Sequence, residues 1–388
     1  MNGAASLIDL TGDELQTSLR VAMVTRFPPS CSGAAQASSD LADTLVVRFG
    51  IDVEVIRLVP LGEHAAPGLP VVMEVNPSWS LGGEAAAARA SHCDVVLVQL
   101  EHSSPMQLVD ELIGRSEVPV VLVLDDVAPD GTDLAESVAA LAKRADAVVV
   151  PSRTARERIR EQTSGSVRAE VIPHGSSWSA LKPRQGIRRR ILTWGFMSPG
   201  MGVERIIHAL ALLGDIEPAP HYRIIGVAHP TWSNTEAARH RRQLLKTAEA
   251  LGVGDSVEFG PVLHSREELF AETRESDILA VMYDAQDRAA SRILTEAVSA
   301  GRPVVATRFP GAVELLASGA GLTVAHEDTA ELAMALRRLL TDDEAYLEAA
   351  EAARSLSPSL GWDSVARRFF DLLMGLSIRG KLDSAARS

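Results

Sequence analysis

The sequence predicts an α/β protein built from two doubly wound parallel-sheet domains that face a cleft, and three observations lead to this fold class. Short apolar runs alternate with longer helical patterns along almost all of the 388 residues. Most of these runs are nearly continuous Val, Ile and Leu, as expected for strands buried on both faces of a parallel sheet. The alternation is interrupted once, at residues 176–190, which are rich in Arg and contain Pro183 and Gly186.

The first half of the chain contains a series of expected strands separated by helical patterns. The strands are residues 20–25, 52–58, 71–75, 94–99, 118–124, 147–150 and 170–173. Helices are expected at 35–48, 105–113 and 134–145. A further helix is expected at 153–161 with Ser152 as its N-cap, because a serine oxygen accepts a hydrogen bond from the free amides of the first turn. Strand and helix therefore alternate as in a doubly wound sheet.

The second half repeats this alternation and ends in helices. Its expected strands are residues 191–193, 222–227, 256–259, 277–282, 303–307 and 322–324. The helices between them are 203–213, 235–251, 266–272, 291–300 and 312–317. Three closing helices are expected at 329–340, 343–355 and 362–376.

We therefore predict two domains and a C-terminal extension. Residues 1–180 form the first domain and residues 181–361 the second. Residues 362–388 form a helix and tail that pack back across the domain junction. The interruption at 176–190 is interpreted as a flexible linker whose arginines are solvated, because it contains few apolar residues.

The composition argues against several classes of protein. The 38 Lys and Arg residues against 51 Asp and Glu residues give a net charge of −13, so a nucleic-acid binder is not expected. Cys31 and Cys93 cannot make a disulfide framework, and no Cys/His spacing is typical of a zinc site. No secretory leader is recognisable, and no run reaches ~18 uninterrupted apolar residues. We expect a cytoplasmic protein.

Two loops that follow predicted strands contain candidate binding glycines, because ligands of open α/β sheets lie beyond the carboxyl ends of the strands. Gly33 permits a close backbone approach just before a positively polarised helix end. Gly195, Gly200 and Gly202 leave backbone N–H groups open toward an anion such as a diphosphate. Turn geometry alone is the alternative role of these glycines. Neither loop has a dinucleotide-binding or P-loop spacing.

A third loop, residues 283–297, contains Arg288, Ser291, Arg292 and Glu296. A helix that starts near Ser291 brings free N–H groups and two arginines to one spot. Glu296 lies four residues after Arg292, so these two side chains are able to pair along the helix. Alternatively, the carboxylate accepts hydrogen bonds from a ribose diol.

Several of these segments together resemble a known family. They are Pro28, Pro29 and Gly33, and residues 98–101, 145–152, 171–175, 195–204, 226–230 and 296–307, in order over about residues 20–340. With them the chain resembles family 4 glycosyltransferases of the GT-B fold, in which two Rossmann-like domains face a cleft. The resemblance implies retaining transfer of a hexose from a nucleotide-sugar donor, a UDP- or GDP-sugar, with no metal or other cofactor.

The resemblance also implies roles for the two halves and for several residues. Residues 1–180 become the acceptor-side domain and residues 181–361 the donor-binding domain. Gly33 is expected near the donor phosphate, the glycines 195, 200 and 202 beneath it, and Glu296 on the nucleotide ribose. The implied acceptor is a polysaccharide, a glycolipid or another glycan or lipid-linked acceptor.

Some positions depart from the family pattern. Met201 stands where the family has a lysine, Phe196 replaces an arginine or a small residue, and Arg288 replaces the first of two glutamates. Ser291 and Arg292 replace the start of a helix where the family has glycine. We expect Arg288 and Arg292 to take over the role of the missing lysine, because guanidinium groups pair well with phosphate oxygens.

Candidate catalytic groups follow strands of the first half. Asp125, together with Asp126, is positioned to accept a proton from an acceptor hydroxyl, and a turn-forming role is the alternative. Glu101 and His102 follow another strand and are expected to face the acceptor. Asp125 and Leu100 stand at positions where the family has histidines.

Two other functions stay open on the sequence alone. A catalytically degenerate GT-B protein would act as a binding or scaffold partner of an active glycosyltransferase, and a nucleotide-sugar epimerase would share the fold. The apolar stripe of the last predicted helix leaves peripheral contact with the inner face of a membrane as an alternative to packing within the protein.

Overall fold

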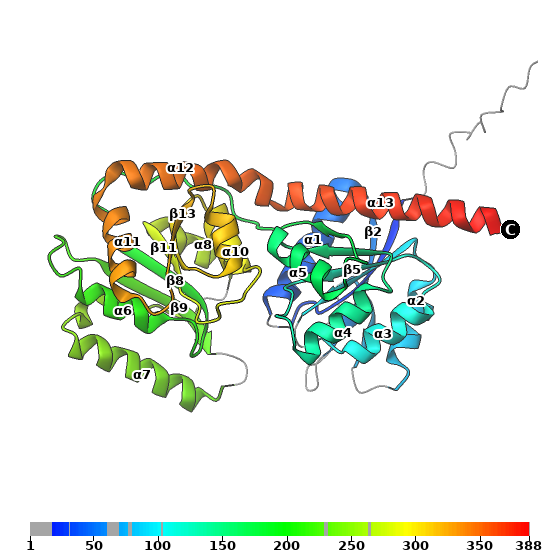
Figure 1. Cartoon of the computed structure of the whole chain (residues 1–388), viewed down its shortest axis with the longest axis horizontal. Helices are drawn as coiled ribbons and strands as arrows, with labels where there is room; N and C mark the ends of the chain where they lie inside the picture. Colours follow the sequence, from blue (N-terminus) through cyan, green and yellow to red (C-terminus); the bar gives the residue numbers. More distant parts are fainter. Residues whose placement is uncertain are drawn as a thin grey trace, which may run out of the picture. The chain divides into compact units, whose positions relative to one another are not determined.

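The computed structural model describes residues 18–30, 32–59, 70–76, 80–101, 104–228, 232–262 and 265–387. Within these residues the chain forms two parallel β-sheets, of seven and six strands, with helices between successive strands (Figure 1). The predicted α/β fold class with two doubly wound sheets is therefore confirmed.

The first sheet has the strand order β3-β2-β1-β4-β5-β6-β7. Its strands are β1 (Arg20–Thr25), β2 (Asp52–Leu58), β3 (Val71–Val75), β4 (Val95–Leu100), β5 (Val120–Leu124), β6 (Ala147–Val150) and β7 (Ala169–Val171). The strand β1 pairs in parallel with β2 on one side and β4 on the other. The order reverses between these neighbours, which is the switch point where doubly wound sheets place ligands.

The helices associated with the first sheet are α1 (Gly33–Phe49), α2 (Gly82–Ala90), α3 (Met106–Arg115), α4 (Asp133–Ala142) and α5 (Arg153–Gln162). A polar side chain caps the start of α1, α4 and α5, whereas α2 starts without a side-chain cap. As predicted, Ser152 caps α5, and its hydroxyl accepts a hydrogen bond from the Ala155 amide at 2.9 Å. Ser32 caps α1 in the same way.

The second sheet has the strand order β10-β9-β8-β11-β12-β13. Its strands are β8 (Arg190–Met197), β9 (His221–Ala228), β10 (Val257–Phe259), β11 (Ile278–Val281), β12 (Val304–Thr307) and β13 (Gly321–Val324). The strand β8 pairs with β9 over its full length and with β11 at its amino end. It is longer than the predicted strand 191–193, because residues 194–197 continue the ladder.

Both faces of the second sheet are buried by helices. These are α6 (Val203–Ala211), α7 (Asn234–Ala250), α8 (Arg266–Glu275), α9 (Arg292–Ser299), α10 (Pro310–Leu316), α11 (Thr329–Thr341) and α12 (Asp343–Leu360), with a short 3₁₀ turn at Gly254–Ser256. The last helix of the chain is α13 (Trp362–Arg387). Ile191 of β8 packs in a cluster with α6 and α11, whereas Leu192 packs with α9 on the other face. This alternation along β8 follows from the two-residue period of a strand.

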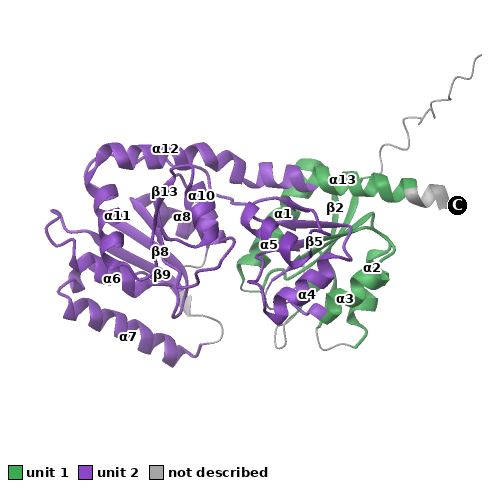
Figure 2. Cartoon of the chain, in the orientation of Figure 1, with its two compact units in different colours: residues 1–99, 107–121, 370–388 green, residues 100–106, 122–369 purple. Residues whose placement is uncertain are grey.

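The chain separates into two compact units (Figure 2). Unit 1 comprises residues 1–99, 107–121 and 370–388, and unit 2 comprises residues 100–106 and 122–369. The helix α13 contributes its first residues to unit 2 and its remainder to unit 1. In unit 2 the Trp362 amide donates to the Ser176 carbonyl at 3.2 Å, and in unit 1 the rings of Phe370 and Phe49 stack 5.0 Å apart.

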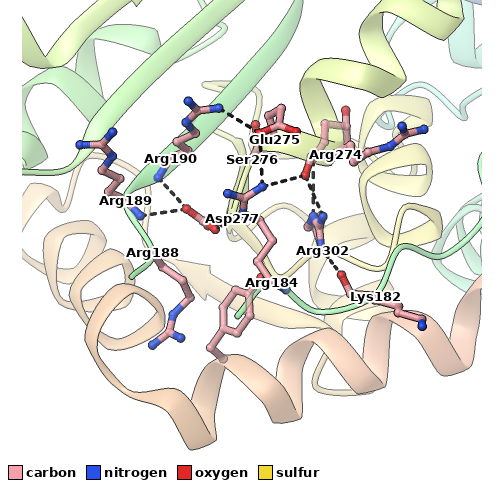
Figure 3. Close-up of polar contacts among 12 residues, drawn as sticks. Lys182, Arg184, Arg188, Arg189, Arg190, Arg274, Glu275, Ser276, Asp277 and Arg302 are labelled. Carbon is pink, nitrogen blue, oxygen red and sulfur yellow. Dashed lines mark hydrogen bonds and ion pairs between the residues drawn. The ribbon is translucent and has the colours of Figure 1, made fainter. Parts of the chain in front are cut away.

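The segment 176–190 is held against the second sheet, so the prediction that its arginines are solvated is wrong for Arg188, whereas Arg189 and Arg190 are exposed as predicted. Arg188 is 7% exposed, donates to Asp343 at 2.5 Å and lies over the ring of Tyr346. The buried carboxylate of Asp277 accepts hydrogen bonds from the amides of Arg189 and Arg190, both at 2.8 Å (Figure 3). Composition did not reveal this, because the partners lie about ninety or more residues away.

A second buried charge fixes the same segment. The side chain of Arg302, 2% exposed, donates to the carbonyls of Lys182 at 2.7 Å and Arg274 at 2.9 Å (Figure 3). These contacts join the segment to the end of α8. The connection is therefore ordered by hydrogen bonds to charged groups, which are stronger than neutral ones.

Candidate functional site

The connection from β8 to α6 contains glycines that close contacts require. A Cβ atom on Gly202, where φ is +65°, would lie 1.9 Å from the Met282 carbonyl oxygen. Gly200 has a φ of +90° with open space around it. Gly195 is a residue of β8 rather than of the loop, paired with Gly226 of β9, which corrects its predicted place. The backbone therefore passes close to the end of β11 at Gly202.

The start of α6 leaves backbone donors free. Gly202 is the N-cap residue, and no side chain caps the helix. Free N–H groups at a helix start attract anions. Met201, at the position where a lysine was expected from the resemblance, packs its side chain against the apolar core of the sheet.

The loop after β11 is tied to this helix start. The Asp284 amide donates to the Gly200 carbonyl at 2.9 Å. The carboxylate of Asp284 accepts from Arg205 of α6, at 3.0 Å from Nε and 2.5 Å from a terminal nitrogen. Sequence reasoning missed Arg205, although its place in the first turns of a helix after a glycine-rich loop was a signal.

Ser291 begins α9 as predicted. Its hydroxyl accepts from the Leu294 amide at 3.2 Å and lies 3.1 Å from the hydroxyl of Tyr283. The residue is 4% exposed, so the hydroxyl acts within the protein as the helix cap.

The predicted pair of Arg292 with Glu296 along α9 does not form. Arg292 pairs instead with Asp125, which follows β5. Glu296 pairs with Arg266, the first residue of α8, at 2.9 Å. The i,i+4 contact is replaced because a carboxylate and a guanidinium from other elements reach the two side chains, and an exposed helical pair contributes little by itself.

His174 completes the surroundings of Asp125. Its Nε2 lies 3.0 Å from the Asp125 carbonyl oxygen and 3.5 Å from its carboxylate. Burial, with Arg292 nearby, lowers the pKa of His174 to about 4, so the ring is neutral near pH 7. Burial alone would raise the pKa of Asp125, but the charges of Arg292 and of the nearby groups lower it overall. Asp125 is therefore an ionised carboxylate bound to a guanidinium.

Arg288 differs from the other three arginines around these loops. Its guanidinium lies over the ring of Tyr283, 4.6 Å from the centroid, and its Nε is buried without a hydrogen-bond partner. Arg205, Arg266 and Arg292 are each paired with a carboxylate. No ion pair is formed by Arg288 among the residues that the structure describes. A guanidinium without an ion pair, in the loop after β11, and an uncapped helix start, in the loop after β8, are both groups that attract anions.

Comparison with known proteins gives this arrangement a family context. A family model described as "Glycosyl transferases group 1" matches residues 182–356. The matched segment, residues 182–356, therefore resembles a glycosyl transferases group 1 domain. It includes the glycine loop, the four arginines 205, 266, 288 and 292, and the buried Arg302.

Two curated proteins from different bacteria are similar to part of this chain. A D-inositol 3-phosphate glycosyltransferase of Corynebacterium urealyticum is 30% identical over 178 residues, 45% of this chain and 40% of its own length. A glycogen synthase of Mycobacterium tuberculosis is 28% identical over 235 residues, 58% of this chain and 53% of its own length. The matches thus span about half of the curated relatives or less.

Solved structures show that the likeness of fold extends beyond the matched segment. A sucrose-phosphate synthase from Thermosynechococcus elongatus superposes with a TM-score of 0.70 over 92% of this chain and 99% of that chain, at 17% identity. The Anabaena protein HepE, crystallised with UDP-glucose, does so with a TM-score of 0.70 over 92% of this chain and 100% of that chain, at 19% identity. The chain therefore has the GT-B fold.

The remaining predicted site residues lie outside the matched segment. Glu101 follows β4 in unit 2, and its backbone amide donates to the Ser104 hydroxyl at 2.9 Å. His102 lies outside the described residues. Gly33, the first residue of α1, belongs to unit 1, whereas the other donor-side candidates belong to unit 2. The structure thus forms two separate groups of predicted residues. Gly200, in the loop that leads to Gly202, contacts Asp284, and Asp125 contacts Arg292.

The described part of the chain contains no group of three or more His, Cys, Asp or Glu side chains able to hold a metal ion. Nor is any of its helices long and apolar enough to cross a bilayer.

Proposed function

We propose that the chain is a retaining glycosyltransferase that moves a hexose from a UDP- or GDP-sugar to a polysaccharide, glycolipid or other glycan. One observation carries this proposal: within the segment matched by the group 1 model, an uncapped helix start and the unpaired guanidinium of Arg288 lie at loops that follow β8 and β11. The UDP-glucose bound by the similarly folded HepE supports a nucleotide-sugar donor.

The diphosphate of the donor is the group that these residues are suited to bind. The N–H groups at the start of α6, after Gly202, would donate hydrogen bonds to the oxygens of one phosphate. The guanidinium of Arg288 would pair with oxygens of the same phosphate. Arg292, at the first position of α9, would supply a second guanidinium. Two arginines then replace the lysine whose position Met201 occupies.

The chemical step needs a stabilised leaving group. As the bond from the anomeric carbon to the donor phosphate breaks, negative charge grows on the diphosphate. Fixed guanidinium groups and helix N–H groups lower the energy of that charge, which is a dominant contribution in many active sites. We propose that Glu296, held by Arg266, accepts hydrogen bonds from the nucleotide ribose.

The acceptor side is assigned to the first half of the chain. Asp125 is ionised and is proposed to take the proton of the acceptor hydroxyl, with Glu101 and His102 as further acceptor contacts. A carboxylate bound to a guanidinium is a weak base, so Asp125 would act once Arg292 has turned to the phosphate.

Calorimetry with UDP, GDP and their glucose conjugates, followed by an assay for release of the nucleotide, tests the proposal. We expect the wild type to bind at least one of these ligands, and Arg288→Ala to bind it about ten- to a hundredfold more weakly, as for loss of one charged contact. Arg337→Ala, which removes an arginine of α11 paired with Asp215, is the matched control and should leave affinity unchanged. A wild-type protein that binds none of the ligands is instead a non-catalytic GT-B partner, and the proposal is then wrong.

A further inference from the structure

Arg292, an arginine of the proposed donor site, is paired with Asp125, but one of its N–H donors has no hydrogen-bond partner. A terminal nitrogen of its guanidinium contacts the Asp125 carboxylate. Its Nε is buried and has no hydrogen-bond partner. A buried donor without a partner loses the hydrogen bond that it would make with water, and the fork of a guanidinium is suited to two oxygens at once. The pair with Asp125 therefore does not satisfy Arg292.

The position of Asp125 is fixed by the chain around it. The amide of Asp125 donates to the Leu100 carbonyl at 3.0 Å. The carboxylate of its neighbour Asp126 accepts from the Val127 amide at 2.8 Å and from the Ala289 amide at 3.2 Å. Ser152 donates to the Ala289 carbonyl at 2.8 Å. The loop that contains Arg288 is thus joined to the segment that contains Asp125, and the two guanidinium groups stay near this carboxylate.

Among the residues that the structure describes, no other cation takes the place of Arg292 beside Asp125. His174 lies 3.5 Å from the carboxylate, but burial keeps the ring neutral near pH 7. Arg288 acts on Asp125 only through its charge, without a direct contact. The carboxylate of Asp125 therefore interacts with Arg292 and Arg288, the two guanidinium groups that we propose bind the diphosphate.

From this geometry, and on the basis of the proposed function, we propose that Asp125 competes with the donor diphosphate for Arg292. In the ligand-free protein the carboxylate holds the guanidinium. A diphosphate contacts Arg292 only when the guanidinium leaves the Asp125 carboxylate. This requirement lowers the apparent affinity of the protein for the diphosphate. Donor binding then frees Asp125, so that the carboxylate becomes available to an acceptor only when the donor is in place.

The competition predicts that removal of a charged side chain tightens binding. If Arg292 is held by Asp125 for about nine-tenths of the time, apparent affinity for the diphosphate is lowered about tenfold, and Asp125→Asn recovers that factor. A mutation that merely damaged the structure would not produce tighter binding.

Calorimetry on the full chain with inorganic pyrophosphate and with UDP tests this inference. We expect Asp125→Asn to bind both about tenfold more tightly than the wild type, and Arg292→Gln to abolish that gain in the double variant. Asp215→Asn removes a carboxylate from the exposed pair with Arg337 and is the matched control, with unchanged affinity. Should Asp125→Asn fail to fold by circular dichroism, Asp125→Ser removes the same charge with a smaller side chain, and the same gain is expected.

The outcomes separate this inference from the proposed function. If the wild type binds UDP and the variants at Asp125 bind it equally or more weakly, Asp125 positions Arg292 rather than competing for it, and the inference is overturned while the proposed function stands. If neither the wild type nor the variants bind UDP or pyrophosphate, the proposed function fails and the inference fails with it.

Discussion

The carboxylate of Glu314 in α10 binds the N-terminal end of α5 at Thr154. One oxygen accepts from both the amide and the hydroxyl of Thr154, each at 2.8 Å. The other accepts from the amide of Arg153 at 2.8 Å. Burial alone would raise the pKa of Glu314, but these backbone and side-chain donors lower it overall. A helix of the first sheet is therefore joined within unit 2 to a helix of the second.

Replacing Glu314 with Ala should destabilise the protein by about 2 kcal/mol, because the amides of the first turn of α5 lose a charged acceptor. Chemical unfolding followed by circular dichroism measures the change. Glu157→Ala is the control, since Glu157 pairs with Arg160 on the exposed surface of α5 and should contribute less than about 0.5 kcal/mol. Equal losses of unfolding free energy in the two variants would show that the contact of Glu314 with the start of α5 contributes no more than an exposed ion pair.

The buried ring of His174 should make stability depend on pH. The unfolded chain binds a proton on this histidine below its ordinary pKa of 6.5, whereas the folded protein does so only below about 4. In that window the unfolded state holds more protons, so stability rises with pH, by up to about 3 kcal/mol across it. Asp125, whose pKa is lowered on folding, adds a loss of stability in the same direction at still lower pH.

Unfolding curves at several pH values between 4 and 6.5 measure this dependence. His174→Gln should flatten the stability profile over the window, because the titrating ring is gone. His221→Gln is the matched control: burial also lowers the pKa of His221, but its side chain is 33% exposed, so its effect should be smaller. A profile that keeps its slope in His174→Gln would mean that another group titrates there.

Much of the fold was predictable because buried strands have a direct signature in sequence. The expected strands 20–25, 52–58, 71–75 and 147–150 have the observed bounds. In 20–25 and 147–150 the signal is a run of buried apolar residues. The strand β8 was predicted too short, because Gly195 was interpreted as part of a loop. In the structure Gly195 lies in the ladder, where a Cβ on the facing Gly226 would lie 2.4 Å from its carbonyl oxygen.

The candidate site was predictable only where one segment determines it. The glycines before α6 and the cap Ser291 were found because each acts on its own neighbours in the sequence. The partner of Arg292 was not found, because Asp125 lies 167 residues away and meets it only through the tertiary fold. A charged residue near the start of a helix has many possible partners, and sequence spacing favours the nearest one.

The guanidinium of Arg302 should be among the most important charges for stability. Arg302→Met keeps most of the buried volume but leaves the carbonyls of Lys182 and Arg274 without their donor, which should cost about 3 kcal/mol. Arg308→Met removes an arginine that pairs with Glu331 on the surface, and should cost less than about 0.5 kcal/mol. Urea unfolding compares the two. A loss as small in Arg302→Met as in the control would mean that water replaces the guanidinium at these carbonyls.

Gly202 and Gly200 form a matched pair for testing the glycine loop. Both have positive φ, so alanine at either position costs about 1 kcal/mol of backbone strain. At Gly202 the added Cβ would also lie 1.9 Å from the Met282 carbonyl oxygen, whereas at Gly200 it meets nothing within 4 Å. We therefore expect Gly202→Ala to displace the start of α6 and to weaken binding of UDP at least tenfold, with Gly200→Ala near the wild type. Calorimetry measures both affinities, and equal affinities in the two variants would show that the start of α6 takes no part in binding the nucleotide.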